Sequence, residues 1–148
     1  MKTIYIAGPI HSYSIFSTWH KVLEVSLQLK GYVVYNPFQQ SLMEENQFLQ
    51  NLLFDGRYEE LSNTIKAIAY KNLQNLQKAD IFILKYDPAI SMMGGIDALI
   101  KALEWKKNIY VYCQPNHYDL IDPYIFNFIN VIYIDWKKLL KTLDYDNN

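Results

Sequence analysis

Hydrophobic and polar positions along this chain alternate between short apolar runs and longer stretches with helical spacing. The apolar runs are rich in β-branched and aromatic residues and predict buried strands at 3–7, 32–35, 80–86, 109–113 and 130–135. The stretches between them predict helices from Ser14 or Ser17 to Gly31, over 41–54, 57–78 and 96–105, and from Asp135 to about Leu143. The polar tail 144–148 is predicted to fray.

Strands that alternate with helices indicate a parallel sheet covered by helices on both faces. Right-handed crossovers between five strands favour the order 2-1-3-4-5, a doubly wound, flavodoxin-like sheet. In that order the switch point lies between the first and third strands, and ligands bind there, outside the strand ends. The length of 148 residues predicts one α/β domain over 1–148. The loops after strands 3–7 and 80–86 are therefore the expected place for chemistry.

Charge, cysteine content and the length of the apolar runs argue against several kinds of binding partner. A formal net charge of −1 argues against a sequence-independent grip on nucleic acid, which needs clustered Lys and Arg. The single cysteine, Cys113, leaves no internal disulfide and no cysteine metal cluster. No apolar run approaches the length of a membrane span, and Pro9 and His11 interrupt the apolar start too early for a signal peptide. These features predict a cytoplasmic protein with no nucleic-acid, membrane or metal partner.

The stretch "ISMMGGIDALIKALEWKK", residues 90–107, combines a glycine pair with a helix start. Gly94 and Gly95 would let the backbone come close to a ligand, and the next turn presents Asp97 and Ala98. Asp97 also has a purely structural explanation, because an acid in a first helical turn stabilises free N–H groups. Asn72 lies on the apolar stripe of helix 57–78, so it either bonds to a loop carbonyl or points into the crevice.

Familiar nucleotide-binding motifs are missing from the sequence. It contains neither GxxxxGK[ST] nor GxGxxG, and the loop "AGPIHSYS" offers too few hydroxyls for a flavodoxin phosphate loop. Asp87 before Pro88 is most often a turn residue, and His20 and His117 are weak candidates for catalysis.

Three segments carry a resemblance to a known family. "KTIYIAGP", "GYVVYNPF" and "NLQNLQKADIFILKYDP…GGIDALIKALEWKKNIYVY" resemble the nucleoside 2-deoxyribosyltransferase family over most of residues 2–113. The resemblance implies a flavodoxin-like sheet and transfer of 2-deoxyribose between nucleobases, in nucleoside salvage, through a covalent glycosyl-enzyme. It also implies no metal or organic cofactor, a deoxynucleoside or nucleobase as ligand, and a homo-oligomer whose sites are completed by a neighbouring subunit.

The acidic residues of the family are absent at the matching positions. Its nucleophilic glutamate falls at Ala98, the acid that protonates the departing base at Asn72, and a further aspartate near Met92. Asp97 is a poor substitute, because one helical residue rotates a side chain by about 100°. The resemblance therefore implies a weak or inactive enzyme, with Ala98 either engineered or natural.

The resemblance and the expected crevice together define a candidate binding set. Its members are Tyr5, Gly8, Pro9, Tyr13, Phe16, Asp87, Gly94 and Gly95, with Asn127 supplied by the neighbouring subunit. Two other functions remain open at this point. One is a non-catalytic nucleoside- or nucleotide-binding or assembly subunit, and the other is a deoxynucleoside 5′-monophosphate N-glycosidase.

Overall fold

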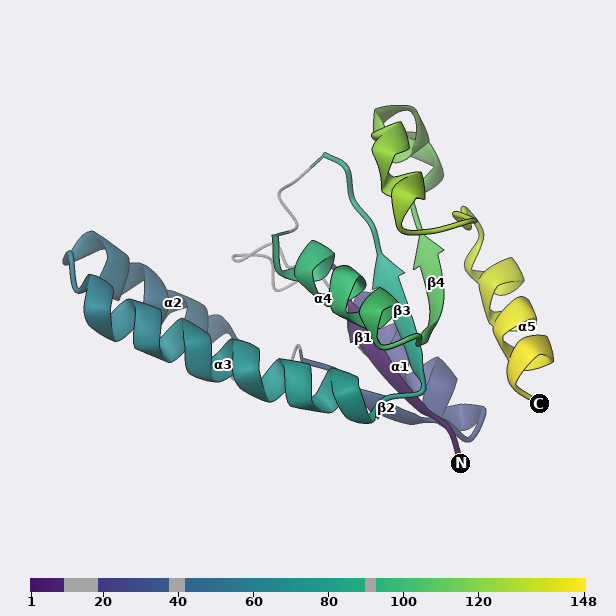
Figure 1. Ribbon diagram of the computed structural model, residues 1–148, viewed down its shortest axis with the longest axis horizontal. Coiled ribbons are helices and arrows are strands. Elements are labelled where there is room, and N and C mark those ends of the chain that lie inside the picture. Colours follow the sequence, from purple (N-terminus) through teal and green to yellow (C-terminus); the bar gives the residue numbers. More distant parts are fainter. Residues whose placement is uncertain (10–18, 38–41, 90–92) are drawn as a thin grey trace.

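A parallel four-stranded sheet forms the centre of the molecule (Figure 1). The computed structural model describes residues 1–9, 19–37, 42–89 and 93–148, without the side chains of 42–46 and 93. The strands are β1 Thr3–Ala7, β2 Val33–Tyr35, β3 Ile81–Lys85 and β4 Asn108–Tyr112, in the order β2-β1-β3-β4. The α/β class, the parallel pairing and the switch point between β1 and β3 are confirmed.

Helices alternate with these strands as the spacing predicts. They are α1 Trp19–Leu29, α2 Leu42–Phe54, α3 Tyr58–Lys78, α4 Met93–Glu104 and α5 Trp136–Asn147, with short 3-10 helices η1 Pro115–Leu120 and η2 Pro123–Asn127. The Ser14 or Ser17 cap expected for the first helix lies outside the described residues. Gly31 follows α1 with a φ of +92°, the left-handed conformation that ends a helix.

The prediction of a fifth strand at 130–135 is wrong. This segment lies beside β4 but makes only an isolated parallel bridge between Tyr112 and Tyr133. Tyr133 donates its N–H to the Val111 carbonyl at 2.8 Å, and its carbonyl accepts the Cys113 N–H at 2.9 Å. Asp135 then caps α5 by accepting the Lys137 N–H at 2.9 Å. α5 begins at Trp136, and the run pairs with β4 at Tyr133 alone.

Two helix boundaries also differ from the expectation. α4 begins at Met93, three residues before the expected start, so Gly94 and Gly95 belong to its first turn and not to a loop. α5 continues to Asn147, four residues beyond the expected end at Leu143. The polar tail is held because Asp144 accepts hydrogen bonds from Lys30 and Tyr32, and Asp146 accepts one from Tyr110. These long-range bonds replace the fraying that a polar tail predicts.

Alternating strand residues face two separate cores. On one face, β1, β3 and β4 pack under α1 and α5, around the buried side chains Ile4, Ile6, Leu23, Leu27, Ile81, Ile83, Leu139 and Leu143. On the other face they pack under α3 and α4, around Tyr5, Ala7, Leu76, Phe82, Leu84, Ala98, Leu99 and Ala102. β1, β3 and β4 are therefore apolar on both sides, as strands of a parallel sheet covered on both faces are.

The amino ends of β1 and β3 are joined by a compact hydrogen-bond cluster. The Asp80 carboxylate accepts from the Thr3 N–H at 2.9 Å and from the Thr3 hydroxyl at 3.0 Å. The Asp80 N–H in turn bonds to the Thr3 carbonyl at 3.0 Å. These bonds fix the register that pairs Ile4 with Ile81 along the two strands. The Thr3 N–H, the Thr3 hydroxyl and the nearby Lys107 and Lys2 lower the pKa of the Asp80 carboxyl, against a smaller opposing effect of burial.

Asp80→Asn is expected to destabilise the protein at pH 7 and to alter its response to acid. A carboxyl whose pKa is lowered on folding stabilises the folded state above its unfolded pKa, about 3.9, and loses that contribution as the pH falls. Urea unfolding at pH 7 and at pH 3 should therefore show a difference between wild type and variant that narrows in acid. Asp119→Asn, which removes an exposed carboxylate from η1, is the control. A difference independent of pH would contradict the assignment.

Candidate active site

The loops that follow β1 and β3 meet at the carboxyl edge of the sheet. Ala7 and Leu84 are paired at the ends of these strands, so the Gly8-Pro9 backbone and the segment 86–89 leave the sheet side by side. In the order β2-β1-β3-β4, the connection after β1 leads to β2 on one side of this point and the connection after β3 leads to β4 on the other side. That is the position at which open α/β sheets bind their ligands.

Gly8 is required by the close approach of an aromatic ring. A Cβ at this position would lie 2.6 Å from Trp19 Cζ2 and 3.1 Å from the Cβ of Lys85. The Trp19 indole N–H donates to the Pro9 carbonyl at 3.2 Å, which holds the loop against α1. The glycine thus serves packing of the loop within the protein.

Asp87 has two identifiable roles within the described structure. It is only 6% exposed, and its Oδ1 accepts the Ala89 N–H at 3.0 Å, the turn geometry expected before Pro88. The same oxygen lies 3.1 Å from Nδ1 of His117 on η1. The pair connects the loop after β3 to the segment after β4, and it becomes an ion pair when the imidazole is protonated.

Lys85 brings a positive charge to the same edge. Its ammonium lies 5.4 Å from the centre of a Trp19 ring, within cation–π range. Burial lowers the pKa of the Lys85 ammonium, and the Asp87 carboxylate opposes that shift. Burial also raises the pKa of the neighbouring Cys113 thiol, with Asp87 acting in the same direction, so the thiol stays protonated at neutral pH. The edge therefore offers a carboxylate, an ammonium and an imidazole, which can orient a polar ligand or move a proton.

Ala98 is a residue of α4 that faces the core of the protein. It is 8% exposed and belongs to the same buried cluster as Tyr5, Phe82 and Leu99. The Tyr5 ring stacks on Phe82 with centroids 6.2 Å apart, and burial raises the pKa of Tyr5 to about 12. The structure thus places Tyr5 and Ala98 in the same core cluster, on the sheet face opposite α1.

The remaining predicted site residues lie in varied environments. Asn72 is partly buried on α3, next to Leu73, which packs on the same core. Asp97 is exposed, whereas its neighbour Ala98 is buried, as the 100° rotation between them requires. Asn127 is exposed at the end of η2.

The Gly94-Gly95 pair lies in the first turn of α4. A Cβ added to Gly94 would find no described atom within 4 Å, and both glycines are helical. Tyr13, Phe16 and Met92 lie outside the described residues.

Three side chains at this edge are not singled out by the sequence. In the sequence, Trp19 is one of several apolar positions of a predicted helix, and Lys85 ends a predicted strand. His117 is a weak catalytic candidate in a predicted loop. A lysine that ends an otherwise buried strand is the one signal that points to this edge, because Lys is seldom buried without a partner.

Metal-binding clusters and membrane-spanning helices are both absent from the described part of the chain. No three His, Cys, Asp or Glu side chains gather there closely enough to hold a metal ion. None of the helices found in those ranges combines the length and apolarity that crossing a bilayer requires.

Comparison with known proteins reveals similarity at the level of the fold. No family model and no curated protein matches the sequence. Among solved structures, a 2-deoxyribosyltransferase from the psychrotolerant bacterium Bacillus psychrosaccharolyticus matches with a TM-score of 0.62 and 15% identity, covering 99% of this chain and 91% of that one. The CMP N-glycosidase BcmB of Clostridium botulinum matches with a TM-score of 0.56 and 15% identity, covering 97% of this chain and 99% of that one. The chain shares the fold of these two proteins.

Gly8→Ala is expected to destabilise the protein by about 1–3 kcal/mol, because the added methyl collides with the Trp19 ring and the Lys85 stem. Gly94→Ala is the matched control, since the same methyl meets open space and a helical glycine gains about 0.5–1 kcal/mol from this change. Urea denaturation of both variants, followed by tryptophan fluorescence, provides the measurement. Equal stability of Gly8→Ala and wild type would disprove the close contact.

Proposed function

We propose that this chain binds a deoxynucleoside or its 5′-monophosphate at the carboxyl edge between β1 and β3. We further propose that it is related in mechanism to nucleoside 2-deoxyribosyltransferases but has little or no transferase activity as written. The observation that carries the proposal is Ala98, a methyl group at the position where the family resemblance puts the attacking glutamate. The two solved structures that share the fold support it, since one is named a 2-deoxyribosyltransferase and the other a CMP N-glycosidase.

Retaining transfer requires a carboxylate at C1′ of the substrate. The carboxylate attacks C1′, the bond from C1′ to the base nitrogen breaks, and the base leaves with the bonding electrons and gains a proton. An incoming base then displaces the carboxylate. Ala98 cannot form this ester, and Asn72 can donate a hydrogen bond to the departing base but cannot protonate it. Loss of a covalent nucleophile costs roughly 10⁴–10⁶-fold in turnover, whereas binding can survive.

Polar groups at the edge supply the contacts of the proposed site. Backbone groups at Gly8 and Pro9 and the charges of Lys85, Asp87 and His117 would orient the sugar or a phosphate. The ammonium and the imidazole favour an anionic substituent, so a monophosphate is the better candidate if the ligand reaches them. Asn127 of a second copy would complete the site, in the manner that the family resemblance implies.

A second candidate is hydrolysis of a nucleotide N-glycosidic bond. The structural similarity to a CMP N-glycosidase favours hydrolysis over a purely assembling role. Water would replace the second base as acceptor, so free base would appear without exchange. A third candidate, an assembly subunit without ligand, differs from both because no nucleoside or nucleotide would bind.

Binding is tested most simply with a ligand panel. Deoxyadenosine, deoxycytidine, their 5′-monophosphates, CMP and free bases would be titrated by calorimetry, and thermal shift would confirm any hit. The proposal predicts that at least one deoxynucleoside or monophosphate binds, with a dissociation constant roughly in the micromolar to millimolar range. The same compound should raise the melting temperature, because a ligand that binds only the folded state stabilises it. Failure of every compound to bind would leave the assembly subunit as the better explanation.

Ala98→Glu is expected to create or restore base exchange. Mass spectrometry of this variant with deoxyadenosine should detect a deoxyribosyl adduct on the peptide that contains residues 94–101. Because Ala98 is 8% exposed, the larger side chain is expected to cost about 1–3 kcal/mol of stability. Turnover should stay modest, since Asn72 supplies no proton.

Ala98→Gln is the matched control for this experiment, because it has the same size and strain but no nucleophilic carboxylate. It should fold like Ala98→Glu and form no adduct. Asp97→Asn in the original chain tests the remaining possibility: if the original chain exchanges bases rapidly and this change abolishes it, Asp97 is the nucleophile. If Ala98→Glu binds a deoxynucleoside yet forms no adduct, the chain is a binder and not an impaired transferase.

A further inference from the structure

Asp87 and His117 form a side-chain pair of a kind that moves protons in enzymes. Nδ1 of the imidazole lies 3.1 Å from Oδ1 of the carboxylate. An ionised carboxylate can only accept a hydrogen bond, so Nδ1 is the donor in this pair. The proton that the imidazole gains or loses is therefore the one on its other ring nitrogen, Nε2.

The carboxylate of the pair is held in a fixed position. Asp87 is almost fully buried, and its Oδ1 also accepts the Ala89 N–H at 3.0 Å. Two further titratable groups act on it: the Lys85 ammonium, which carries the opposite charge, and the Cys113 thiol, which stays protonated at neutral pH. A carboxylate fixed in this way orients an imidazole and stabilises its protonated form.

Nε2 of His117 is accessible to a ligand. The side chain is 24% exposed, and within the described ranges Nε2 makes no hydrogen bond. No side-chain nitrogen or oxygen of those ranges is both buried and without a partner, so Nε2 reaches the surface. The pair therefore has the parts of a general acid–base: a fixed carboxylate, an oriented imidazole and an accessible ring nitrogen.

The pair lies at the edge where the loops after β1 and β3 leave the sheet. Asp87 comes two residues after Lys85, the end of β3, and a Cβ on Gly8 would lie 3.1 Å from the Lys85 Cβ. His117 approaches from η1, in the segment that Figure 1 shows beyond the carboxyl end of β4. A nucleoside bound between β1 and β3 would therefore lie beside the strand end that carries the pair.

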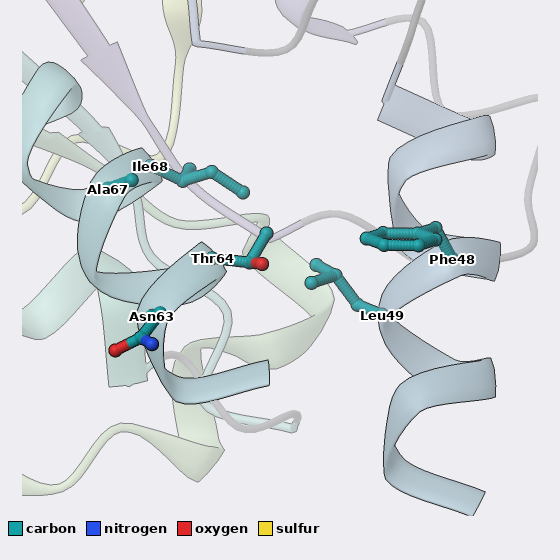
Figure 2. Close-up of a pocket in the computed structure, with 6 residues that line it drawn as sticks. All are labelled: Phe48, Leu49, Asn63, Thr64, Ala67 and Ile68. Atoms are coloured by element: carbon teal, nitrogen blue, oxygen red, sulfur yellow. The ribbon is translucent and has the colours of Figure 1, made fainter. Parts of the chain in front are cut away.

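The pocket between α2 and α3 has no comparable chemistry (Figure 2). Its volume is about 520 Å³, and its lining residues are Phe48, Leu49, Asn63, Thr64, Ala67 and Ile68. None of these six side chains gains or loses a proton near neutral pH. Proton transfer to a ligand is therefore better assigned to the edge between β1 and β3 than to this pocket.

We propose that Asp87 and His117 are a general acid–base pair that hydrolyses the N-glycosidic bond of a deoxynucleoside or its monophosphate bound at this edge. The inference rests on the proposed function, because it needs such a ligand at the edge. It assigns to His117 the proton transfer that Asn72 cannot supply, and it needs no carboxylate at position 98.

The reaction balances with water as the only co-reactant. Protonated His117 donates its Nε2 proton to the base while the bond from C1′ to the base breaks, and the base leaves with the bonding electrons. A water molecule adds to the cationic C1′ and gives a proton to the neutral imidazole, which restores the pair. The products are the free base and 2-deoxyribose or its 5-phosphate. Asp87 stays ionised throughout and stabilises the imidazolium.

Release of free base by the wild-type protein tests the proposal. Deoxyadenosine, deoxycytidine and their 5′-monophosphates would be incubated with the protein from about pH 5 to pH 8, the range in which imidazoles titrate. Liquid chromatography would measure the free base, and calorimetry would measure binding of the same compounds. We expect base release above the rate in buffer at each pH. The enzymatic rate should fall as the pH rises, because bond cleavage needs the protonated ring.

Two variants of His117 separate chemistry from structure. His117→Asn keeps an N–H donor near the place of Nδ1 but removes Nε2, so it should lower the rate at least about 100-fold while the fold is retained. His117→Ala should lose as much, and added imidazole should restore part of the rate, which a purely structural histidine would not show. Circular dichroism would compare the folding of both variants with that of wild type.

Asp87→Asn keeps the shape of the side chain but removes the charge that stabilises the imidazolium. It should lower the rate of base release at least about tenfold. Asn116→Ala is the matched control, because it changes an exposed neighbour of His117 on η1 and should leave the rate unchanged.

Two outcomes would overturn this inference and leave the proposed function intact. They are binding of a deoxynucleoside or monophosphate without release of base, and release of base that His117→Asn leaves unchanged. If none of the compounds binds, the proposed function fails as well, and the calorimetry identifies that case separately.

Discussion

Parallel pairing of β1 with β3 is the constraint on which the rest of this structure depends. It joins residues almost 80 positions apart in the chain, and its register is fixed at the amino end by the bonds between Thr3 and Asp80. Every residue of β1 except Thr3 is buried, so a shift of one residue would exchange the two cores. At the other end the same pairing brings the Gly8-Pro9 backbone next to the segment that carries Asp87. The candidate site is therefore a geometric consequence of the register.

The described structure holds two chemically different regions that bear on the proposed site. Ala98 of α4 belongs to an apolar core together with Tyr5 and Phe82. A carboxylate introduced at position 98 would be partly desolvated, which raises the free-energy cost of burying it and also raises its reactivity. On the edge itself, Lys85, Asp87 and His117 form a small polar cluster whose members partly compensate one another's charge. The proposed ligand combines an apolar base with a polar sugar or phosphate, and the polar cluster is the part of this edge that would orient the sugar or phosphate.

The hairpin of α2 and α3, which projects to one side of the sheet, depends on a different source of stability. An isolated pair of helices gains little stability from propensity alone, and most helical stability comes from burying an apolar face. The face of α2 and α3 that lies beyond the sheet is only partly buried within one copy.

Much of the architecture follows from the sequence because its signals are local. Apolar runs such as "TIYIA" and "IFILK" have strand length and composition, and the helical stripe of 57–78 repeats over several turns, so these elements need no distant partner to be recognised. The order β2-β1-β3-β4 also follows, because right-handed crossovers leave few possible topologies. The family resemblance rests on these same segments, and it directs attention to position 98.

Other features depended on contacts that no local pattern encodes. The run 130–135 has the composition of a strand but becomes a single bridge, because Asp135 caps α5 immediately after it. The polar tail is helical because Asp144 and Asp146 find partners more than 30 residues away, and α4 takes up the glycines that were expected in a loop. Asp87 meets His117, and Gly8 meets Trp19, only once the strands are aligned. Local patterns in the sequence thus identify most of the strands and helices. The tertiary structure decides the exceptions and also which side chains meet at the site, because those meetings depend on distances that the chain fixes only when it is folded.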